Sequence, residues 1–312
     1  MIHHASDTET DQAFPLHELS STPELVLDCR SNLAESVIWD DREDKLVWVD
    51  IHAGVVWSWR PLQSAEPKSV KVGSRIGAVA LSEGPEVIVA REAGFAAIDL
   101  STGVSRSLGE VPNPVTNVRL NDGRVDPVGR FVCGGMDESE PQRSVAALYS
   151  LSAHNGCATM LESIRCTNSI CWSPSGTTFY FTDMPTRRID AFDYDIRSGT
   201  LSNRRLFCDL SDEPGLPDGS IVDAEGCLWN AQWGGAKLVR YTPDGRVDRE
   251  VRLPVTNPTC LAFGGKDLDV LFVTTAWFGL TSVQRGAQPT AGSIYAFRPG
   301  VRGRAEYRFG AR

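Results

Sequence analysis

The sequence predicts an all-β protein, a six-bladed β-propeller, on two observations. First, a polar turn followed by a short strand-like run returns six times along the 312 residues. We take the start of one strand in each repeat as an anchor: Leu46, Glu86, Arg130, Phe179, Cys227 and Val270. Successive anchors are 40, 44, 49, 48 and 43 residues apart. A period of this size, with several short strands in each unit, is typical of propeller blades. Second, long stretches with helical periodicity are missing, which argues against alternating strands and helices.

Each repeat can be followed in order along the chain. The six units are IWDDREDKLVWVDI from Ile38, LSEGPEVIVAREAG from Leu81, VDPVGRFVCGGMD from Val125, WSPSGTTFYFTD from Trp172, VDAEGCLWNAQW from Val222 and FGGKDLDVLFVTTAW from Phe263. Runs such as VWVD, FYFTD and VLFVTT are rich in β-branched and aromatic residues, and DDRED, SPSG and DAEG are turn sequences. Most tryptophans are therefore expected in the core or between blades, with Trp233 and Trp277 at a pocket mouth. A two-sheet sandwich with irregular repeats is the alternative fold.

Composition narrows the class of protein. The net charge of −9 argues against nucleic acid as a partner. The sequence has no run of about 20 apolar residues, so no membrane span is predicted. Residues 1–23 are polar without an apolar signal region, so we expect a tail there, a single propeller domain over 24–312 and a cytoplasmic protein. The eight cysteines lack metal-binding spacing and are expected to be reduced. The oligomeric state is left open.

Polar residues recur at one phase of the repeat. Glu35 and Asn168 lie 11 residues before their anchors, and Asn121 and Asp218 lie 9 before theirs. Equal phase in a propeller means equal radius and height, so these side chains should converge on the axis. The other two repeats read RIGAVA and PTCLAF there, with no carboxylate or amide. The alternative is that these residues only form turns, because Asn-Asp-Gly and Pro-Asp-Gly are common turn sequences.

Carboxylate and amide oxygens are the ligands of a hard divalent ion such as Ca²⁺ or Mg²⁺. Zn²⁺ more often takes His or Cys, and no His lies at this phase. The five histidines offer no placed Ser-His-Asp triad, and nucleotide-binding loops are missing. We therefore expect one axial divalent ion, with Ca²⁺ first and Zn²⁺, Mg²⁺, Mn²⁺ or Fe²⁺ as alternatives.

At these residues the chain resembles the senescence marker protein/gluconolactonase/luciferin-regenerating enzyme family, also called regucalcin-like. The resemblance rests on LAESVIW around Glu35, RLNDGRVDPVGRFVCGGMDE from Arg119, TNSICWSPSGTTFYFTD from Thr167 and PDGSIVDAEGCLWNAQW from Pro217. It implies a six-bladed propeller in which Glu35, Asn168 and Asp218 ligate one divalent ion. It further implies that Arg119 and Asn121 contact substrate. Within the family, the chain is most similar to bacterial sugar lactonases of the L-arabinolactonase type.

Two departures from the family pattern stand out. The family usually reads Gly-Glu-Gly-Pro at the first ligand, whereas this chain reads Ala34-Glu35-Ser36-Val37, so Ser36 is expected to narrow or polarise the rim of the site. Glu138 follows Gly135-Met136-Asp137 with slightly different spacing from an acidic substrate contact of animal relatives. It is kept as a candidate substrate-binding residue.

The expected reaction is the hydrolysis of a sugar lactone to the aldonic acid, with L-arabinono-1,4-lactone or a related pentono- or hexonolactone as substrate. The metal would act as Lewis acid, Asp218 as general base and Arg119 as a second electrophile. A metal-bound hydroxide is the alternative base. Two other functions stay open: a metal-binding propeller without turnover, and a metal-dependent esterase or organophosphate hydrolase, although such propellers often carry a catalytic His near the metal.

Overall fold

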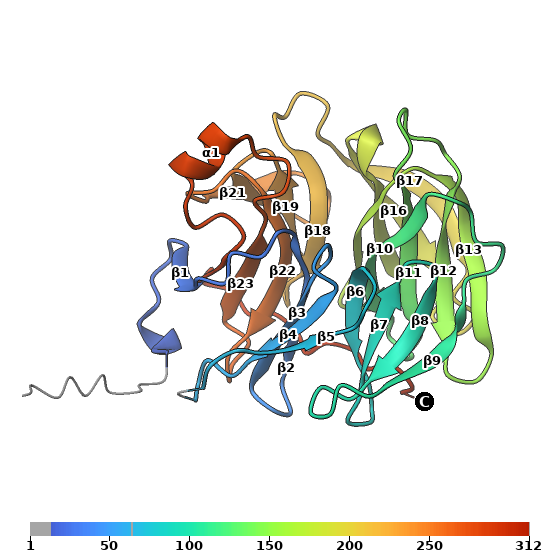
Figure 1. The fold of residues 1–312 in the computed structure, drawn as a ribbon. Coiled ribbons are helices and arrows are strands. Elements are labelled where there is room, and N and C mark those ends of the chain that lie inside the picture. The colour runs from blue at the N-terminus through green and yellow to red at the C-terminus, as the bar shows by residue number, and fades with distance from the viewer. Residues whose placement is uncertain (1–13, 64, 312) are drawn as a thin grey trace, which may run out of the picture.

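The computed structural model describes residues 14–63 and 65–311, and in these residues six antiparallel sheets of four strands are arranged as a ring (Figure 1). The first three blades, from axial to outer strand, are β2 (Ala34–Asp40), β3 (Lys45–Asp50), β4 (Val55–Trp59), β5 (Lys68–Lys71); β6 (Ile76–Leu81), β7 (Val87–Arg91), β8 (Gly94–Ile98), β9 (Ser105–Glu110); and β10 (Val118–Val125), β11 (Phe131–Asp137), β12 (Ala146–Ser152), β13 (Gly156–Ile164).

The other three blades have the same strand order. They are β14 (Thr167–Trp172), β15 (Thr178–Asp183), β16 (Arg188–Tyr194), β17 (Leu201–Asp209); β18 (Leu216–Val222), β19 (Leu228–Trp233), β20 (Lys237–Tyr241), β21 (Val247–Arg252); and β22 (Pro258–Gly264), β23 (Val270–Thr275), β24 (Ile294–Phe297), β1 (Glu24–Leu27). The six-bladed propeller is thus confirmed and the sandwich is excluded. Each sequence anchor lies within one residue of the start of the second strand of its blade.

The sixth blade closes the ring. Its outermost strand is β1, which comes from the N-terminal end of the chain and pairs with β24, with Glu24 opposite Ala296. The hydrogen bonds of this pairing join the first and last parts of the described chain and so close the ring.

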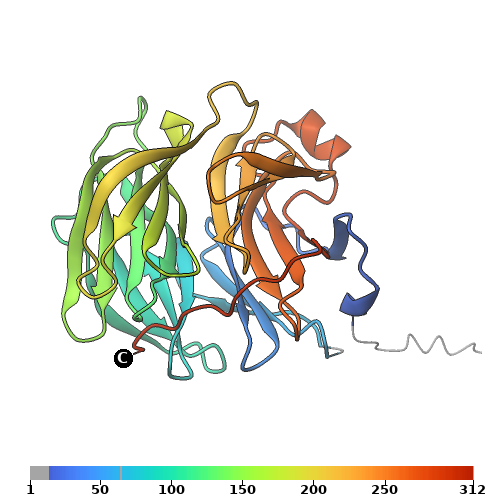
Figure 2. The same ribbon diagram turned by 180° about the vertical axis from the view of Figure 1, so that it is seen from behind.

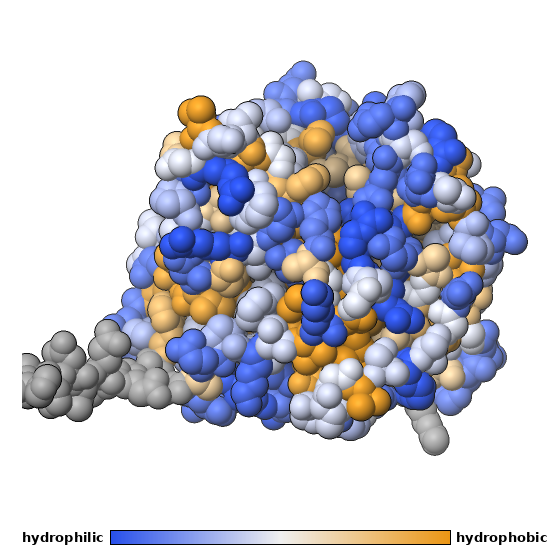
Figure 3. Space-filling view, viewed as in Figure 1, coloured by the Kyte–Doolittle hydropathy of each residue, from blue (hydrophilic) through white to orange (hydrophobic). Residues whose placement is uncertain are grey.

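Short helices lie outside the sheets. They are η1 (Leu16–Glu18), η2 (Met184–Thr186) and α1 (Ser282–Ala287), the last in the connection between β23 and β24. None of the helices in the described residues has the length and apolar character needed to cross a membrane. Figure 3 shows hydrophilic residues over most of one side of the molecule, with smaller hydrophobic patches between them.

Part of the predicted N-terminal tail, residues 14–23, packs against the propeller. Leu16 and Leu19 are buried in the apolar cluster that also contains Trp39 and Phe272. Two apolar side chains among polar neighbours are too weak a pattern to predict packing from sequence. Their place against the first and sixth blades is seen only in the structure. Residues 1–13 of the predicted tail lie outside the described residues.

The hydrophobic core consists of six clusters, each between two neighbouring blades. Tryptophans contribute as expected: Trp39 of the first blade stacks on Phe272 of the sixth, with ring centroids 5.7 Å apart. Trp229 and Phe297 meet edge to face between the fifth and sixth blades. The burial of these rings, together with the aliphatic side chains of the same clusters, holds neighbouring blades together.

The C-terminal residues 301–311 cross one end of the ring, the end formed by the turns that follow the axial strands. The backbone N–H of Ala224, in the fifth blade, donates to the carbonyl of Arg302, and that of Glu83, in the second blade, donates to the carbonyl of Phe309. Figure 2 shows this segment in red, ending at the mark C. It covers the axis at that end, so the opposite end is left as the accessible one.

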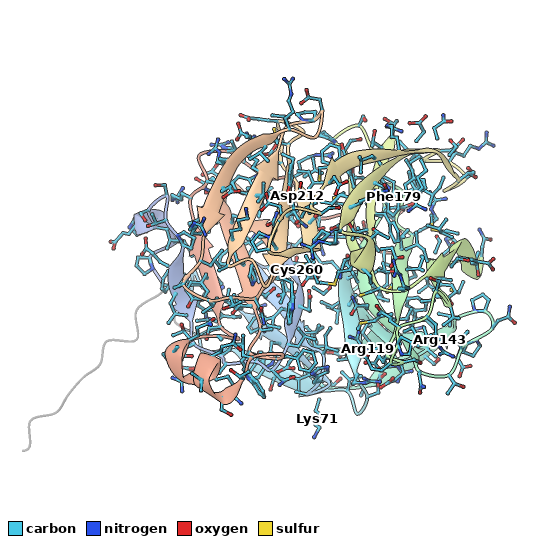
Figure 4. All side chains as sticks on the ribbon, turned by 90° about the horizontal axis from the view of Figure 1, so that it is seen from above. Lys71, Arg119, Arg143, Phe179, Asp212 and Cys260 are labelled. Atoms are coloured by element: carbon cyan, nitrogen blue, oxygen red, sulfur yellow. The ribbon has the colours of Figure 1, made fainter. Side chains whose placement is uncertain are left out.

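All eight cysteines are free thiols in the structure. Six of them are buried, and burial raises the pKa of Cys166, Cys171 and Cys260 above the usual thiol range. Cys260 lies near the centre of the ring in the view from above, whereas Lys71 projects from its edge (Figure 4). Protonated thiols in this setting are packing groups.

Candidate active site

The polar residues of equal phase all lie near the beginning of an axial strand. Glu35 is the second residue of β2, Asn168 the second of β14, Asp218 the third of β18 and Asn121 the fourth of β10. Each of these strands has a shift of register at this place. A bulge locally re-aims a strand, and the result is that four blades present oxygen-bearing side chains to one cavity.

Side chains next to these residues fasten each axial strand to the next blade. Ser169 Oγ donates to the carbonyl of Asp218 over 2.6 Å, and Thr259 Oγ1 donates to the carbonyl of Ala34 over 2.5 Å. Asp122 accepts a hydrogen bond from the backbone of Ile170 over 3.0 Å. The backbone that carries each candidate ligand is therefore fixed from a neighbouring blade.

Ser36 also forms hydrogen bonds to a neighbouring blade, so the expectation that it narrows or polarises the rim of the site is wrong. It is buried, and its Oγ is hydrogen-bonded to both the N–H and the carbonyl of Val79, over 2.9 and 3.3 Å. Its φ of 51° lies in the left-handed region, which costs little for glycine but strains a side-chain-bearing residue. The two hydrogen bonds offset this strain and hold Glu35 in place.

The cavity has a volume of about 200 Å³ at the end of the ring that the C-terminal segment leaves open. It is lined by Leu33, Glu35, Arg119, Asn121, Met136, Cys166, Asn168, Met184, Leu216, Asp218, Trp233 and Phe278. Of the predicted site residues, the structure brings five together here: Glu35, Arg119, Asn121, Asn168 and Asp218. The size suits a single small molecule.

Arg119 organises one side of the cavity, here called the polar wall, which it forms together with Asn121. It is buried, its Nε donates to Glu138 over 2.9 Å and its Nη1 donates to Asn121 Oδ1 over 2.7 Å. Asn121 Nδ2 in turn donates to the carbonyl of Thr167 over 2.9 Å. Glu138 also receives a hydrogen bond from Arg75 and is not among the lining residues, so the structure places it behind Arg119.

Two acidic side chains lie together at the cavity. Burial raises the pKa of both Glu35 and Asp218, and the charge of Asp122 raises both further. The charge of Glu35 adds to the rise at Asp218, whereas the hydrogen bond between the two carboxyls lowers the pKa of Glu35 and raises that of Asp218. Burial also raises the pKa of Asp122. Two carboxyls in such a place share a proton unless a cation neutralises them.

This donor set fits a divalent ion. Glu35, Asp218 and the amide oxygen of Asn168 are hard oxygen donors, and a dication would replace the proton that the two carboxyls otherwise share. In the part of the chain that the structure describes, no group of three or more His, Cys, Asp or Glu residues is placed to hold a metal. A site here would therefore rely on amide oxygen and water beside two carboxylates.

Some site residues were missed from the sequence. The repeat does not single out Asp122, which belongs to the Asn-Asp-Gly segment that is also common in turns, and the structure places it inside β10 at the bulge. Phe278, rather than the expected Trp277, lines the cavity together with Trp233. Trp277 instead lies against the guanidinium of Arg285. A strand end gives no sign of which of two adjacent aromatic rings points inward.

Comparisons with known proteins identify similar sequences and similar solved structures. The family profile described as the SMP-30/Gluconolactonase/LRE-like region matches residues 33–299. L-arabinolactonase of Azospirillum brasilense is 38% identical over 288 residues, covering 91% of this chain and 94% of the relative. Regucalcin of Gallus gallus is 33% identical over 286 residues, covering 90% and 95%. The crystal structure of a calcium-binding protein, regucalcin, from Agrobacterium tumefaciens has a TM-score of 0.86 at 27% identity, covering 91% of this chain and 96% of that one.

Proposed function

Since the chain belongs to the SMP-30/gluconolactonase/LRE-like family, we propose that it hydrolyses a sugar lactone to the open-chain aldonic acid with one divalent ion. The observation that carries the proposal is the pair of acids at the cavity, half-buried Glu35 and buried Asp218, beside the polar wall of Arg119 and Asn121. L-arabinono-1,4-lactone is the first substrate to consider, because a relative with 38% identity is an L-arabinolactonase.

A divalent ion, Ca²⁺ in the first place, would be held by Glu35, Asn168 and Asp218 and would supply a Lewis acid for the lactone carbonyl. Asp218 is the general base, which takes a proton from the attacking water while the water oxygen bonds to the carbonyl carbon. The bond between that carbon and the ring oxygen then breaks. The leaving oxygen takes the proton from Asp218 and becomes a hydroxyl group.

Arg119 and Asn121 orient the sugar. The guanidinium carries the positive charge of the polar wall, so it can donate to a substrate hydroxyl or to the oxygen on which negative charge develops. Its contacts with Glu138 and Asn121 leave little rotational freedom, so its orientation exists before the substrate binds. Glu138 is proposed to act through Arg119.

The proposal is tested with metal-stripped protein and a lactone panel. The panel comprises L-arabinono-, D-xylono-, D-galactono- and D-glucono-lactone, with Ca²⁺, Mg²⁺, Mn²⁺, Fe²⁺ and Zn²⁺ added back singly. We expect acid release above the spontaneous rate with at least one ion and none without metal. If one ion binds but no lactone is opened, the alternative of a metal-binding propeller without turnover replaces the lactonase.

A smaller effect is expected for Asn121→Ala. It removes a neutral side chain that bonds Arg119 and the Thr167 carbonyl, and an unsatisfied partner of this kind costs about 1–3 kcal/mol. We expect kcat/KM to fall by roughly tenfold to a hundredfold, with the metal still bound. Steady-state kinetics and a metal titration of the same preparation check this, and loss of the metal would show that Asn121 has a ligand role instead.

A further inference from the structure

The cavity has two unlike walls on opposite sides of the ring. Arg119, Asn121 and Met136 come from the third blade. The facing residues Leu33, Leu216, Trp233 and Phe278 come from the first, fifth and sixth blades and are all apolar. The reaction proposed above uses the polar wall and the acids but gives the apolar wall no role.

Phe278 is unusual on this wall, because 45% of this large apolar residue is exposed although its backbone is held on both sides. Its N–H donates to the carbonyl of Asn32 over 3.0 Å, and its own carbonyl accepts from Asn257 Nδ2 over 3.0 Å. Both bonds reach out of the loop into other parts of the fold. The phenyl ring is therefore presented at the cavity by a fixed backbone.

The neighbours of Phe278 fix the ring as well. His52 meets it edge to face, with centroids 4.5 Å apart, and the His52 ring is itself hydrogen-bonded to Asn32. Trp233 is a second aromatic neighbour, with its ring centroid 6.5 Å from that of Phe278. Burial and the nearby Arg119 lower the pKa of His52, so this support is an uncharged ring at neutral pH.

We propose that Phe278 and Trp233 are specificity-determining residues that bind one C–H face of a sugar lactone ring. A cyclic sugar derivative has both hydroxyl groups and patches of C–H surface, and the facing walls offer a partner for each. Contact with the aromatic rings removes apolar surface from water, while Arg119 and Asn121 take the hydroxyl groups. This inference rests on the proposed function.

The pair of walls selects for a closed ring over an open chain. A flat aromatic surface matches a rigid ring face, whereas an acyclic polyol must lose rotational freedom to present its C–H groups on one side. The open-chain acid formed by hydrolysis would also lose this contact. The aromatic wall therefore favours substrate over product.

Binding can be measured without turnover by titrating 1,4-anhydro-L-arabinitol, a five-membered ring without a carbonyl, and L-arabinitol, its open-chain counterpart, in a calorimeter. We expect the wild type to bind the ring more tightly. Phe278→Ala should weaken ring binding and raise KM for the lactone by about tenfold, for a loss of roughly 50 Å² of apolar contact, with kcat within about twofold. Phe278→Tyr should restore both values.

Phe278→Leu is the second variant, since it keeps an apolar side chain and removes the flat face. It should lose most of the preference for the ring. Val283→Ala is the matched control, because Val283 is 84% exposed on α1 in the same connection. Unchanged ring binding in both Phe278→Ala and Phe278→Leu, or a fall in kcat at constant KM, overturns the inference. A wild type that binds the ring but opens no lactone overturns the proposed function alone.

Discussion

Asp218→Asn should lose metal binding and lactone hydrolysis together. The substitution keeps the shape of the side chain, and the Asp218 carbonyl can still accept from Ser169 and Asn230. What it removes is the negative charge that pairs with Glu35 around a cation, and the group that takes a proton from water. Loss of a general base alone lowers the rate by about a hundredfold to ten-thousandfold.

The measurements are metal content after dialysis and kcat at saturating metal. Asp212→Asn is the matched control, since Asp212 is an exposed carboxylate six residues earlier in the chain, and it lies away from Arg119 in the view from above (Figure 4). It should behave as wild type. An Asp218→Asn protein with full activity would rule out the proposed site, although a lactonase with another centre would remain tenable.

Arg124→Met should destabilise the fold by about 3–5 kcal/mol, the cost of leaving one member of a buried ion pair alone. Arg124 lies inside the ring, where its Nη1 donates to Glu306 over 2.7 Å and its Nη2 to the carbonyl of Leu261 over 3.2 Å. Both side chains of the pair are only 10% exposed. Glu306 belongs to the C-terminal segment, so the pair joins that segment to the third blade.

Urea unfolding followed by circular dichroism measures this cost. The double variant Arg124→Met/Glu306→Met should recover most of the stability, because it leaves no unpaired charge. Asp244→Ala is the control, since Asp244 pairs with Arg246 at the surface, where their side chains are 53% and 83% exposed, and no measurable change is expected. An Arg124→Met protein as stable as wild type would contradict the role given to the pair.

The stability of the Arg124→Met protein should depend on pH because of Glu306. Burial raises the pKa of Glu306 above its ordinary value even beside Arg124, and removing the guanidinium raises it further. The folded protein then holds this proton more tightly than the unfolded chain, so its stability falls as pH rises above about 4.5. The loss in free energy of unfolding of Arg124→Met relative to wild type should therefore be larger at pH 8 than at pH 5.

Much of the fold could be predicted because a propeller repeats itself. Six similar units place the anchors Leu46 and Val270, far apart in the chain, at equivalent points of their blades. The same regularity put Glu35, Asn168 and Asp218 at one phase, and the structure brings them to one cavity. Repetition turns a position in the sequence into a position in space, which few other folds allow.

Residues outside the repeat could not be placed in this way. Phe278 follows the last strand anchor in a connection without counterpart in the other blades, and Ser36 looked like a rim residue although its hydroxyl holds Val79. Their roles depend on the direction of a side chain at a bulge or a loop. The direction of such a side chain is set by contacts with other blades, so it cannot be predicted from the local sequence.

The sequence by itself thus determined the blades, their number and the phase of the polar residues, because strand composition, turn chemistry and period are local properties of the chain. Only the tertiary structure decided that β1 completes the last blade, that Glu306 meets Arg124 inside the ring, and that an aromatic wall faces Arg119. These contacts join residues hundreds of positions apart or belong to different blades. They arise when the ring closes, and their energies come from burial and charge pairing that no single segment contains.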